Sequence, residues 1–428
     1  MRSSALLIVC ALPMLADSDL HSDIDAGAQD VEEQVIAWRR DIHRNPELSN
    51  REHRTAALVA KHLRSLGIDV TTGVAHTGVV GLLKGGKPGP VVALRADMDA
   101  LPVVEQTGLP YASTVKAEYL GQEVGVMHAC GHDNHVAILM GAATVLAGIR
   151  EALPGTVKLI FQPAEEGPPP GEEGGAALMI REGVLETPRV DAIFGLHVGQ
   201  TPVGEVGYRP LGMMASAQRF EIRVKGRQTH GAAPWAGVDP IVAGAQIVMS
   251  LQTIVSRRVD VTAAPAVVTV GTFQAGVRNN IIPDEAVLTG TIRTFDPQIT
   301  EYVHERIQEI ATQVAAANGA TAEVTIDDGT AVTFNDATLA ARMRGSLERV
   351  YGADHVVEIP RVTVAEDFSA FQQEVPGLFF FIGVRPADVP PEKAIPNHSP
   401  YFYADESALE GGVRVMSTLA VDYLLGAD

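Results

Sequence analysis

The 428-residue chain has few cysteines, few basic residues and no long apolar run. Its two cysteines are too few for the disulfide framework of a small secreted scaffold. Lys and Arg total 33 against 52 Asp and Glu, a net charge of −19, and no basic cluster offsets it, which argues against nucleic-acid binding. No stretch approaches the roughly 20 apolar residues that span a bilayer, so we expect no membrane-spanning segment.

The first residues have the pattern of a secretory signal. Arg2 precedes an apolar run from Ala5 to Leu15, and polarity returns at Asp17. The run is too short to cross a membrane but suits the core of an export signal. We therefore predict a signal peptide over about residues 1–20, with Ala16 a candidate cleavage point, and a secreted or periplasmic protein. A disordered leader or a short buried helix are the alternatives.

Loss of this leader would also remove Cys10 and leave Cys130 as the only cysteine. No intramolecular disulfide could then form, although an exported protein would be allowed one. Cys130 would have to be a buried thiol, a reactive thiol or a metal ligand.

Alternating strand and helix patterns favour an α/β fold with a mainly parallel sheet. Two helical patterns cover Glu52–Leu66 and Asp133–Arg150. Short apolar, β-branched runs, typical of buried parallel strands, end abruptly in polar segments. In parallel sheets ligands bind beyond the carboxyl ends of the strands, so we expect the site at these polar segments. These runs are "VVALRADMD" (91–99), "VKLIFQPAEE" (157–166), "AIFGLHV" (192–198) and "FFFIGV" (379–384). The patch "EEGPPPGEEGG" (165–175) then reads as a stiff loop next to the site.

The middle of the chain has a different order of elements. Strand-like segments at 218–226, 266–273, 286–295 and 322–326 alternate with helical patterns at Pro240–Arg257 and from Pro297 to Asn318. The order strand–helix–strand–strand–helix–strand is the ferredoxin-like (α+β) arrangement. We predict that residues 212–327 form a second domain inserted into the first, whose two parts are residues 30–211 and 328–428.

The stretch "MHACGHDNHVA" (127–137) carries the first candidate metal ligands. Cys130 and His132 stand two apart around a glycine, and a turn would point both side chains the same way. A thiolate and an imidazole can share one Zn²⁺ ion. The alternative is that Cys130 only packs in the core.

Two adjacent glutamates follow an apolar strand in "QPAEE". Bringing Glu165 and Glu166 close to a core is costly without compensation. In an extended segment they would point opposite ways, so that one could bind metal while the other faced the attacking water. The alternative is a solvated acidic loop.

Three further segments complete the candidate site. His197 ends an apolar strand, and His398 lies in the proline-rich "PNHSP". Together with Cys130, His132 and Glu166 they make five potential ligands, more than one catalytic zinc uses, which suggests two metals sharing a water. Asp97 and Asp99 in "RADMDALP" are natural partners for the imidazoles, unless they only form a polar turn after the strand.

Eight motifs resemble one branch of a known family. In order they are "WRRDIHRNPELSNRE", "RADMDALP", "MHACGHDNHVA", "QPAEEG", "GLHV", "THGAAPW", "AEDF" and "NHSP". The chain is identified from them, over about Val35 to the C-terminus, as similar to the hippurate hydrolase and indole-acetyl-amino-acid hydrolase branch of the aminoacylase/carboxypeptidase G-like metallopeptidases. The resemblance implies a di-metal hydrolase domain interrupted by a ferredoxin-like lid through which two subunits pair.

The resemblance also implies roles for the candidate residues. Cys130 would bridge two metals, one also held by His132 and His197, the other by Glu166 and His398. Glu165 would be the general base. Much of the family has an aspartate as the bridge and a histidine in place of Asp97, which sets this branch apart.

Three lid residues resemble substrate-contacting residues of the family. His230 in "QTHGAAPW" would reach the developing oxyanion, often from the neighbouring subunit, while Asn280 and Arg293 would hold the substrate carboxylate. His230 could instead be a turn residue, and Arg293 could pair with an acid on the lid sheet. Glu366 and Asp367 in "AEDF" would orient the site or cap a helix.

These observations predict a metal-dependent amidohydrolase that cleaves N-acyl, hippurate-like amino acids to a carboxylate and a free amino acid. We expect two divalent ions, Zn²⁺ first and Mn²⁺, Co²⁺ or Ni²⁺ as alternatives, and a homodimer paired through the inserted domain. A dipeptidase or carboxypeptidase with the same centre is one alternative, and a secreted solute-binding protein is another. A serine hydrolase is disfavoured because no G-x-S-x-G turn is present.

Overall fold

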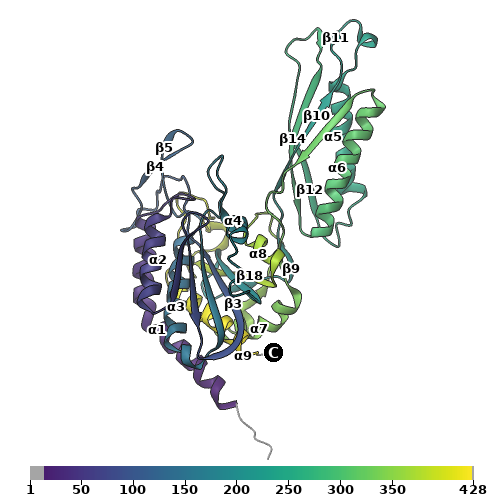
Figure 1. The fold of residues 1–428 in the computed structure, drawn as a ribbon. Coiled ribbons are helices and arrows are strands. Elements are labelled where there is room, and N and C mark those ends of the chain that lie inside the picture. Colours follow the sequence, from purple (N-terminus) through teal and green to yellow (C-terminus); the bar gives the residue numbers. More distant parts are fainter. Residues whose placement is uncertain (1–13, 427–428) are drawn as a thin grey trace, which may run out of the picture. The chain divides into compact units, whose positions relative to one another are not determined.

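The computed structural model describes residues 14–426, which form two compact units (Figure 1). Within the described residues, the first comprises residues 14–207, Arg342–Val357 and residues 380–426, and the second Tyr208–Ala341 and Glu358–Phe379. The predicted insertion at 212–327 falls inside the second unit, which is larger than that prediction. Of the predicted leader, residues 1–13 lie outside the described residues, and residues 14–20 begin helix α1 (Met14–Arg44).

An eight-stranded sheet forms the centre of the first unit. Strand β3 pairs in parallel with β6 and β7, whereas β2 is antiparallel to both β1 and β6. The strand order is β1 (Asp69–Val74), β2 (Gly78–Lys84), β6 (Pro154–Gln162), β3 (Lys87–Asp97), β7 (Ala192–Pro202), β18 (Gly377–Arg385), β8 (Val206–Tyr208), β17 (Val356–Glu358). The predicted α/β fold with a mainly parallel sheet is confirmed, and the four predicted apolar strands are its central ones.

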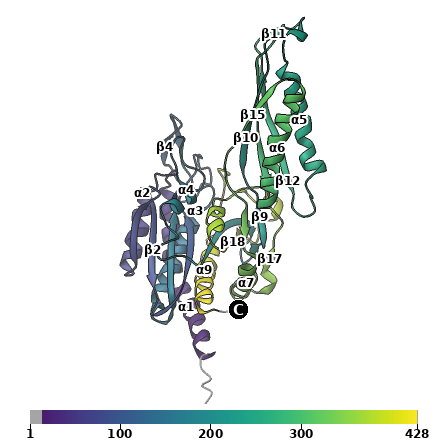
Figure 2. The same cartoon turned by 45° about the vertical axis from the view of Figure 1, so that its right-hand side comes forward.

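Helices pack on this sheet through apolar faces. Helix α3 (His132–Gly148) contacts β3, β6 and β7, and it is buried along almost its whole length, as its uniformly apolar sequence predicts. Helices α9 (Ala408–Leu425) and α1 pack against α3, while α2 (His53–Ser65) covers β1 and β2. Figures 1 and 2 show these helices beside the strands. Shorter elements of the unit are the hairpin β4 (Lys116–Tyr119) and β5 (Gln122–Gly125), and helix α4 (Gly175–Arg181).

The second unit contains the predicted ferredoxin-like arrangement. In chain order its main elements are β10 (Gln218–Lys225), α5 (Pro240–Arg257), β12 (Ala266–Ala275), β14 (Glu285–Thr294), α6 (Pro297–Ala317) and β15 (Thr321–Ile326). The strands lie in the order β12-β14-β10-β15, and every pairing is antiparallel. Asp296 caps α6 by accepting from the N–H groups of Gln298 and Ile299, and Gly319, with φ of 73°, follows the end of that helix.

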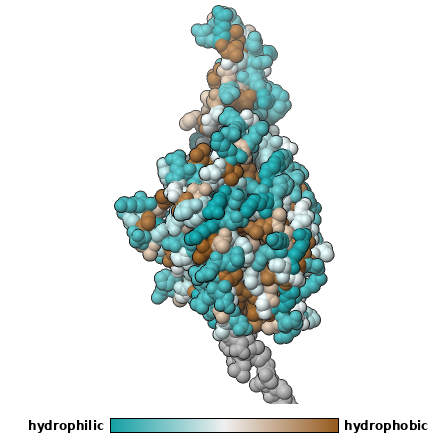
Figure 3. Space-filling view, turned by 90° about the vertical axis from the view of Figure 1, so that its left-hand side faces the viewer, coloured by the Kyte–Doolittle hydropathy of each residue, from teal (hydrophilic) through white to brown (hydrophobic). Residues whose placement is uncertain are grey.

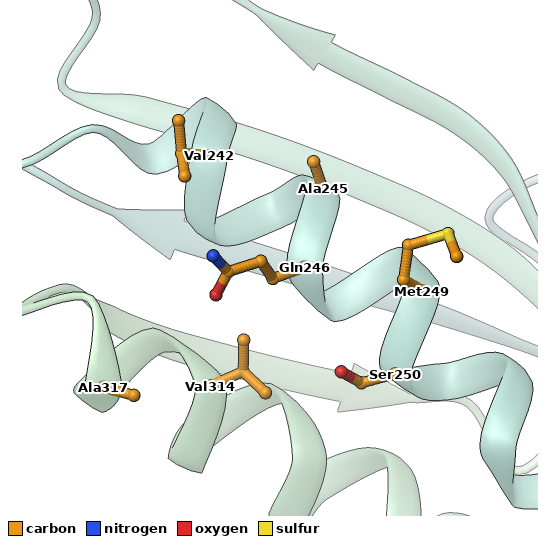
Figure 4. A pocket seen from close by; sticks show the side chains of 7 residues that line it. All are labelled: Val242, Ala245, Gln246, Met249, Ser250, Val314 and Ala317. Atoms are coloured by element: carbon orange, nitrogen blue, oxygen red, sulfur yellow. The ribbon is translucent and has the colours of Figure 1, made fainter.

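The remaining elements of this unit are short, namely β9 (Leu211–Met214), β11 (Thr229–His230), β13 (Ile281–Ile282), β16 (Thr333–Asn335) and α8 (Phe368–Glu374). Helix α7 (Ala337–Tyr351) begins in the second unit, and its residues from Arg342 on belong to the first. Helices α5 and α6 leave a shallow hollow between them, which Figure 4 shows. It is lined by Val242, Ala245, Gln246, Met249, Ser250, Val314 and Ala317. Two of these side chains are strongly exposed, Val242 by 49% and Met249 by 71%.

Hydrophilic side chains cover most of the face shown in Figure 3. Within residues 14–426, no helix is both long enough and apolar enough to cross a bilayer.

Candidate metal centre

The candidate ligands come from separate segments of the first unit. Gly131, with φ of 100°, makes the turn that separates Cys130 from His132, the first residue of α3. His197 lies within β7 rather than at its end, so that detail of the prediction is wrong. Glu166 follows β6, and His398 lies in a turn near the C-terminus with φ of 69°.

Cys130 lies at the middle of this group. Its Sγ is 3.3 Å from Nε2 of His197 and 3.2 Å from Nε2 of His398, whose Nε2 is in turn 3.0 Å from Oε1 of Glu166. Potential ligand atoms of Cys130, His132 and His197 lie within 4.8 Å of one another, and so do those of Cys130, Glu166 and His398. These are the two sets that the resemblance implies, joined by the sulfur.

The spacing suits a zinc-like ion. Sulfur and imidazole ligands at about 2.3 and 2.0–2.1 Å, at a tetrahedral angle, are about 3.5 Å apart. The two sulfur–nitrogen distances at Cys130 are close to this value. Side chains of His132 and His197 are buried, whereas that of His398 is 54% exposed, so within the first unit the group is open to solvent at His398.

Hydrogen bonds fix the orientation of the imidazoles. Nδ1 of His132 donates to the backbone carbonyl of Asp99 at 2.8 Å, and Nδ1 of His197 donates to that of Val198 at 2.8 Å. Each bond leaves Nε2 facing the sulfur side of the site. Nε2 of His132 is buried and has no hydrogen-bond partner among the described residues. Because an unsatisfied buried polar atom is costly, this nitrogen fits a bound cation.

The electrostatics of Cys130 and its neighbours also fit a cation. Burial, and then the negative charge of Glu166, raise the pKa of the Cys130 thiol well above its ordinary value. A thiolate could therefore form here only with a positive charge beside it. Burial, and then the neighbouring His135, lower the pKa of His197, which keeps that imidazole neutral as a ligand must be.

Asp97 was predicted as a partner for the ligand imidazoles, but it accepts from His135, which is not among the predicted ligands. Its Oδ1 accepts from Nδ1 of His135 at 2.5 Å but is 3.8 Å from Nδ1 of His132, and its Oδ2 accepts from Arg95 at 2.7 Å. Nε2 of His135 accepts from the N–H of Val198 at 2.9 Å. Both ring nitrogens of His135 are thus engaged, so it supports β7 and does not serve as a ligand. His135 follows His132 by three residues, a spacing that brings two side chains to the same face of a helix, so the sequence could have predicted that His135 lies close to the ligands.

The two glutamates lie in a turn, not in the extended segment that we expected. Oδ1 and Oδ2 of Asp99 accept from the N–H groups of Glu165 and Glu166 at 3.0 and 3.1 Å. Oε1 of buried Glu52 accepts from the N–H of Ala164 at 3.0 Å, and Ala164 has φ of 54°. Three successive N–H groups are therefore held by two buried carboxylates, which fixes where Glu165 and Glu166 point. No sequence motif had predicted this role for Glu52.

Glu165 lies beside the candidate ligands. Its Oε2 is 3.7 Å from Nε2 of His132, and its side chain is 9% exposed. Ligand atoms of His132, Glu165 and Glu166 lie within 4.8 Å of one another. The two carboxylates converge on one region instead of pointing apart, which places Glu165 within reach of a water molecule held there.

The lid candidates occupy two separate places in the second unit. His230 and Asn280 are neighbours, because His230 pairs with Ile281 across β11 and β13, and both side chains are exposed. Arg293 lies eight residues along β14 from Glu285, a distance of about 26 Å at 3.3 Å per residue. It donates to the carbonyl of Ile292. The structure thus brings His230 and Asn280 together and places Arg293 at the other end of the sheet.

The acidic pair of "AEDF" lies at the start of α8. Glu366 is buried, and its Oε1 accepts from the N–H of Phe368 at 2.9 Å. Asp367 occupies the N-cap position without a side-chain capping bond. Glu366 therefore provides the helix-capping bond that we had considered for either residue.

Comparison with known proteins identifies the family. Residues 93–422 match the sequence profile of peptidase family M20/M25/M40. The chain belongs to this family. It is 40% identical over 411 residues to thermostable carboxypeptidase 2 of Saccharolobus solfataricus, covering 95% of this chain and 99% of that protein. It is 39% identical over 405 residues to the IAA-amino acid hydrolase ILR1-like 5 of Arabidopsis thaliana, covering 94% and 89%.

A solved structure agrees with this assignment to the M20 family. The Bacillus subtilis YXEP protein, described as a dinuclear metal binding peptidase of the M20 family, superposes with a TM-score of 0.75 and 35% identity, covering 96% of this chain and 99% of that one. Our chain is accordingly a metal-dependent hydrolase that acts on amide bonds, and not a solute-binding protein. The individual roles of its site residues stay predictions.

Proposed function

We propose that this M20 enzyme is a two-metal amidohydrolase that cleaves N-acyl amino acids to a carboxylate and a free amino acid. The observation that carries the proposal is the convergence of Cys130 with two separate pairs of ligands, beside a carboxylate that belongs to neither pair. Two ions would be held by Cys130, His132 and His197 and by Cys130, Glu166 and His398. Zn²⁺ suits these ligands best, and Mn²⁺, Co²⁺ and Ni²⁺ remain candidates.

Glu165 would act as the general base in this proposal. When bound, divalent cations polarise the amide carbonyl and make water acidic enough to attack at neutral pH. Glu165 would take the proton from that water and pass it to the leaving amine nitrogen. The backbone bonds from Glu165 and Glu166 to Asp99 hold the base in position without using its carboxylate.

The N-acyl assignment can be separated from a dipeptidase by substrate choice. A dipeptide carries a free ammonium group, which needs an anionic partner, whereas an N-acyl group is neutral. We expect chelated enzyme, restored with each metal in turn, to hydrolyse N-benzoyl and N-acetyl amino acids faster than the dipeptides with the same terminal residue. Preferential hydrolysis of free dipeptides would instead favour a dipeptidase or a carboxypeptidase. The relative from Saccharolobus solfataricus is named a carboxypeptidase.

We further propose that the subunits pair through the second unit. Exposed Val242 and Met249 on α5, and the unpaired outer edge of β12, provide a surface that a second copy can cover. Within one subunit Arg293 lies about 26 Å along β14 from Glu285 by the strand rise, whereas Asn280, the neighbour of His230, precedes Glu285 by five residues. If all three contact one small substrate, they must come from two subunits.

A mixing experiment tests this arrangement and the oxyanion role of His230. His230→Ala and Glu165→Gln proteins should each be nearly inactive, and subunit exchange between them should restore about a quarter of the wild-type rate. This value follows because about half of randomly exchanged dimers are mixed, and each mixed dimer has one complete site. No recovery despite proven exchange, or a monomer mass by light scattering, would refute the shared site.

We also propose that the protein is exported. Cleavage at or before Ala16 would leave the buried Leu20 in the mature chain, where it contributes to the fold. N-terminal sequencing of protein from the periplasm or the medium tests this, and an intact Met1 would contradict it.

A further inference from the structure

Asn397, the half-buried residue before His398, connects three separate segments of the candidate metal centre. Its Nδ2 donates to the backbone carbonyl of Cys130 at 2.7 Å and to that of Val198 at 3.3 Å. Both partners are carbonyl oxygens, which only accept, so the amide nitrogen and not the amide oxygen must face them. Cys130 and Val198 are 267 and 199 residues away along the chain. One side chain thus joins the segments that carry Cys130, His197 and His398.

Two successive carbonyls of the turn that carries Cys130 accept from the segment of His398. The N–H of His398 donates to the carbonyl of Ala129 at 2.8 Å. The Asn397 amide donates to the next carbonyl, that of Cys130. His398 has φ of 69°, a backbone conformation that is unfavourable for histidine and persists only where the surrounding structure holds it. The two bonds therefore set where the His398 imidazole lies relative to the sulfur.

The second bond of Asn397 reaches the strand that carries His197. The carbonyl of Val198 accepts from Asn397 and also from Nδ1 of His197 at 2.8 Å, the bond that orients this imidazole. The Cys130 turn packs closely on the same residue, since a Cβ at Gly131 would lie 2.4 Å from Cγ2 of Val198. Displacement of the Asn397 amide would consequently change the positions of both imidazoles relative to the sulfur.

We propose that Asn397 is a positioning residue that keeps Cys130 between His197 and His398, so that one sulfur can reach both metal ions. The inference rests on the proposed function, in which two ions share that sulfur. Metal–ligand distances vary by only about 0.2 Å, so a shared ligand must be held precisely relative to the other ligands of each ion. The amide nitrogen acts through two backbone carbonyls and not on a metal or on the substrate.

The test compares chelated wild-type and Asn397→Ala proteins in solutions whose free Co²⁺ is buffered by a competing chelator. Binding is followed by the absorption of sulfur-to-cobalt charge transfer. In wild type this absorption should rise through two equivalents, because both ions contact the sulfur. In Asn397→Ala the second increment should need about 10- to 100-fold more free Co²⁺, the usual cost of losing a residue that orients metal ligands. A merely structural role would lower the melting temperature without changing the cobalt affinities or the absorption.

Asn318→Ala is the matched control. Asn318 is also half-buried, and its Nδ2 likewise makes two bonds, to Oε1 of Gln246 at 2.8 Å and to the carbonyl of Val314 at 2.9 Å. All three residues belong to the second unit, whereas the candidate ligands belong to the first. Asn318→Ala should therefore bind both cobalt ions as wild type does.

The outcomes separate this inference from the proposed function. Wild-type cobalt affinities and absorption in folded Asn397→Ala would overturn the inference while the function stood. If that variant did not fold, Asn397→Ser would replace it, because a hydroxyl has one proton and can donate to only one of the two carbonyls. Wild-type values in Asn397→Ser would refute the inference equally.

Neither readout needs a substrate. If wild-type enzyme cleaved no N-acyl amino acid, the proposed substrate class would fail while a weakened second cobalt site in Asn397→Ala still supported the positioning role. Absorption that rose through only one equivalent in wild type would contradict the shared sulfur itself, and this inference with it.

Discussion

Replacement of Glu165 by glutamine is expected to lower kcat by a factor on the order of 10²–10⁴ while leaving the bound metal in place. Glutamine keeps the size of the side chain but cannot take a proton from water. The turn that carries the residue should survive, because Asp99 holds it through backbone N–H groups of Glu165 and Glu166. Steady-state kinetics and elemental analysis of the same sample measure both effects.

Glu173→Gln is the matched control for that loss. Glu173 lies in the same acidic loop, its side chain is 74% exposed, and it pairs with Arg181 on the surface. Its replacement should change kcat by less than about twofold, because an exposed ion pair contributes little. A Glu165→Gln enzyme with wild-type turnover would remove the general-base assignment, whatever the control showed.

Cys130→Ser should lose at least one of the two metal equivalents, and nearly all activity with it. The serine hydroxyl is similar in shape to the thiol, but it does not ionise at neutral pH. It therefore binds zinc-like ions much more weakly than a thiolate does. Because Sγ of Cys130 lies near both His197 and His398, its loss affects both ligand sets. Elemental analysis after dialysis against metal-free buffer measures the occupancy of wild type and variant.

The chain supplies its own control for this substitution. Cys10 is the other cysteine, in the predicted leader, and Cys10→Ser should leave metal content and activity unchanged. Unaltered metal content in Cys130→Ser would mean that the thiol only packs, and the bridging role would have to be abandoned.

Local patterns predicted the elements well where caps and periodicity agree. Helix α5 runs from Pro240 to Arg257, as expected, because Asp239 accepts from the N–H groups of Ile241 and Val242 and Pro240 suits the first turn. The polar residues after apolar strands were also informative. Parallel pairing of β3 with β6 and β7 brings those ends together, which explains why distant motifs form one site.

The parts that the sequence did not predict depend on contacts between distant residues. The turn at Glu165 is set by Glu52, 112 residues before Ala164, and by Asp99. No local pattern reports such bonds, so the segment resembled a simple continuation of β6. In the same way, the sequence could not show that Asp97 bonds to His135 and not to His132, because this depends on how α3 packs against β3.

Anomalous X-ray scattering from crystals of the zinc-loaded enzyme tests the central claim most directly. The account predicts two zinc peaks, one in contact with Cys130, His132 and His197 and the other with Cys130, Glu166 and His398, so that both ions share the sulfur. A single peak that does not touch Cys130, or no peak among these side chains, would contradict it.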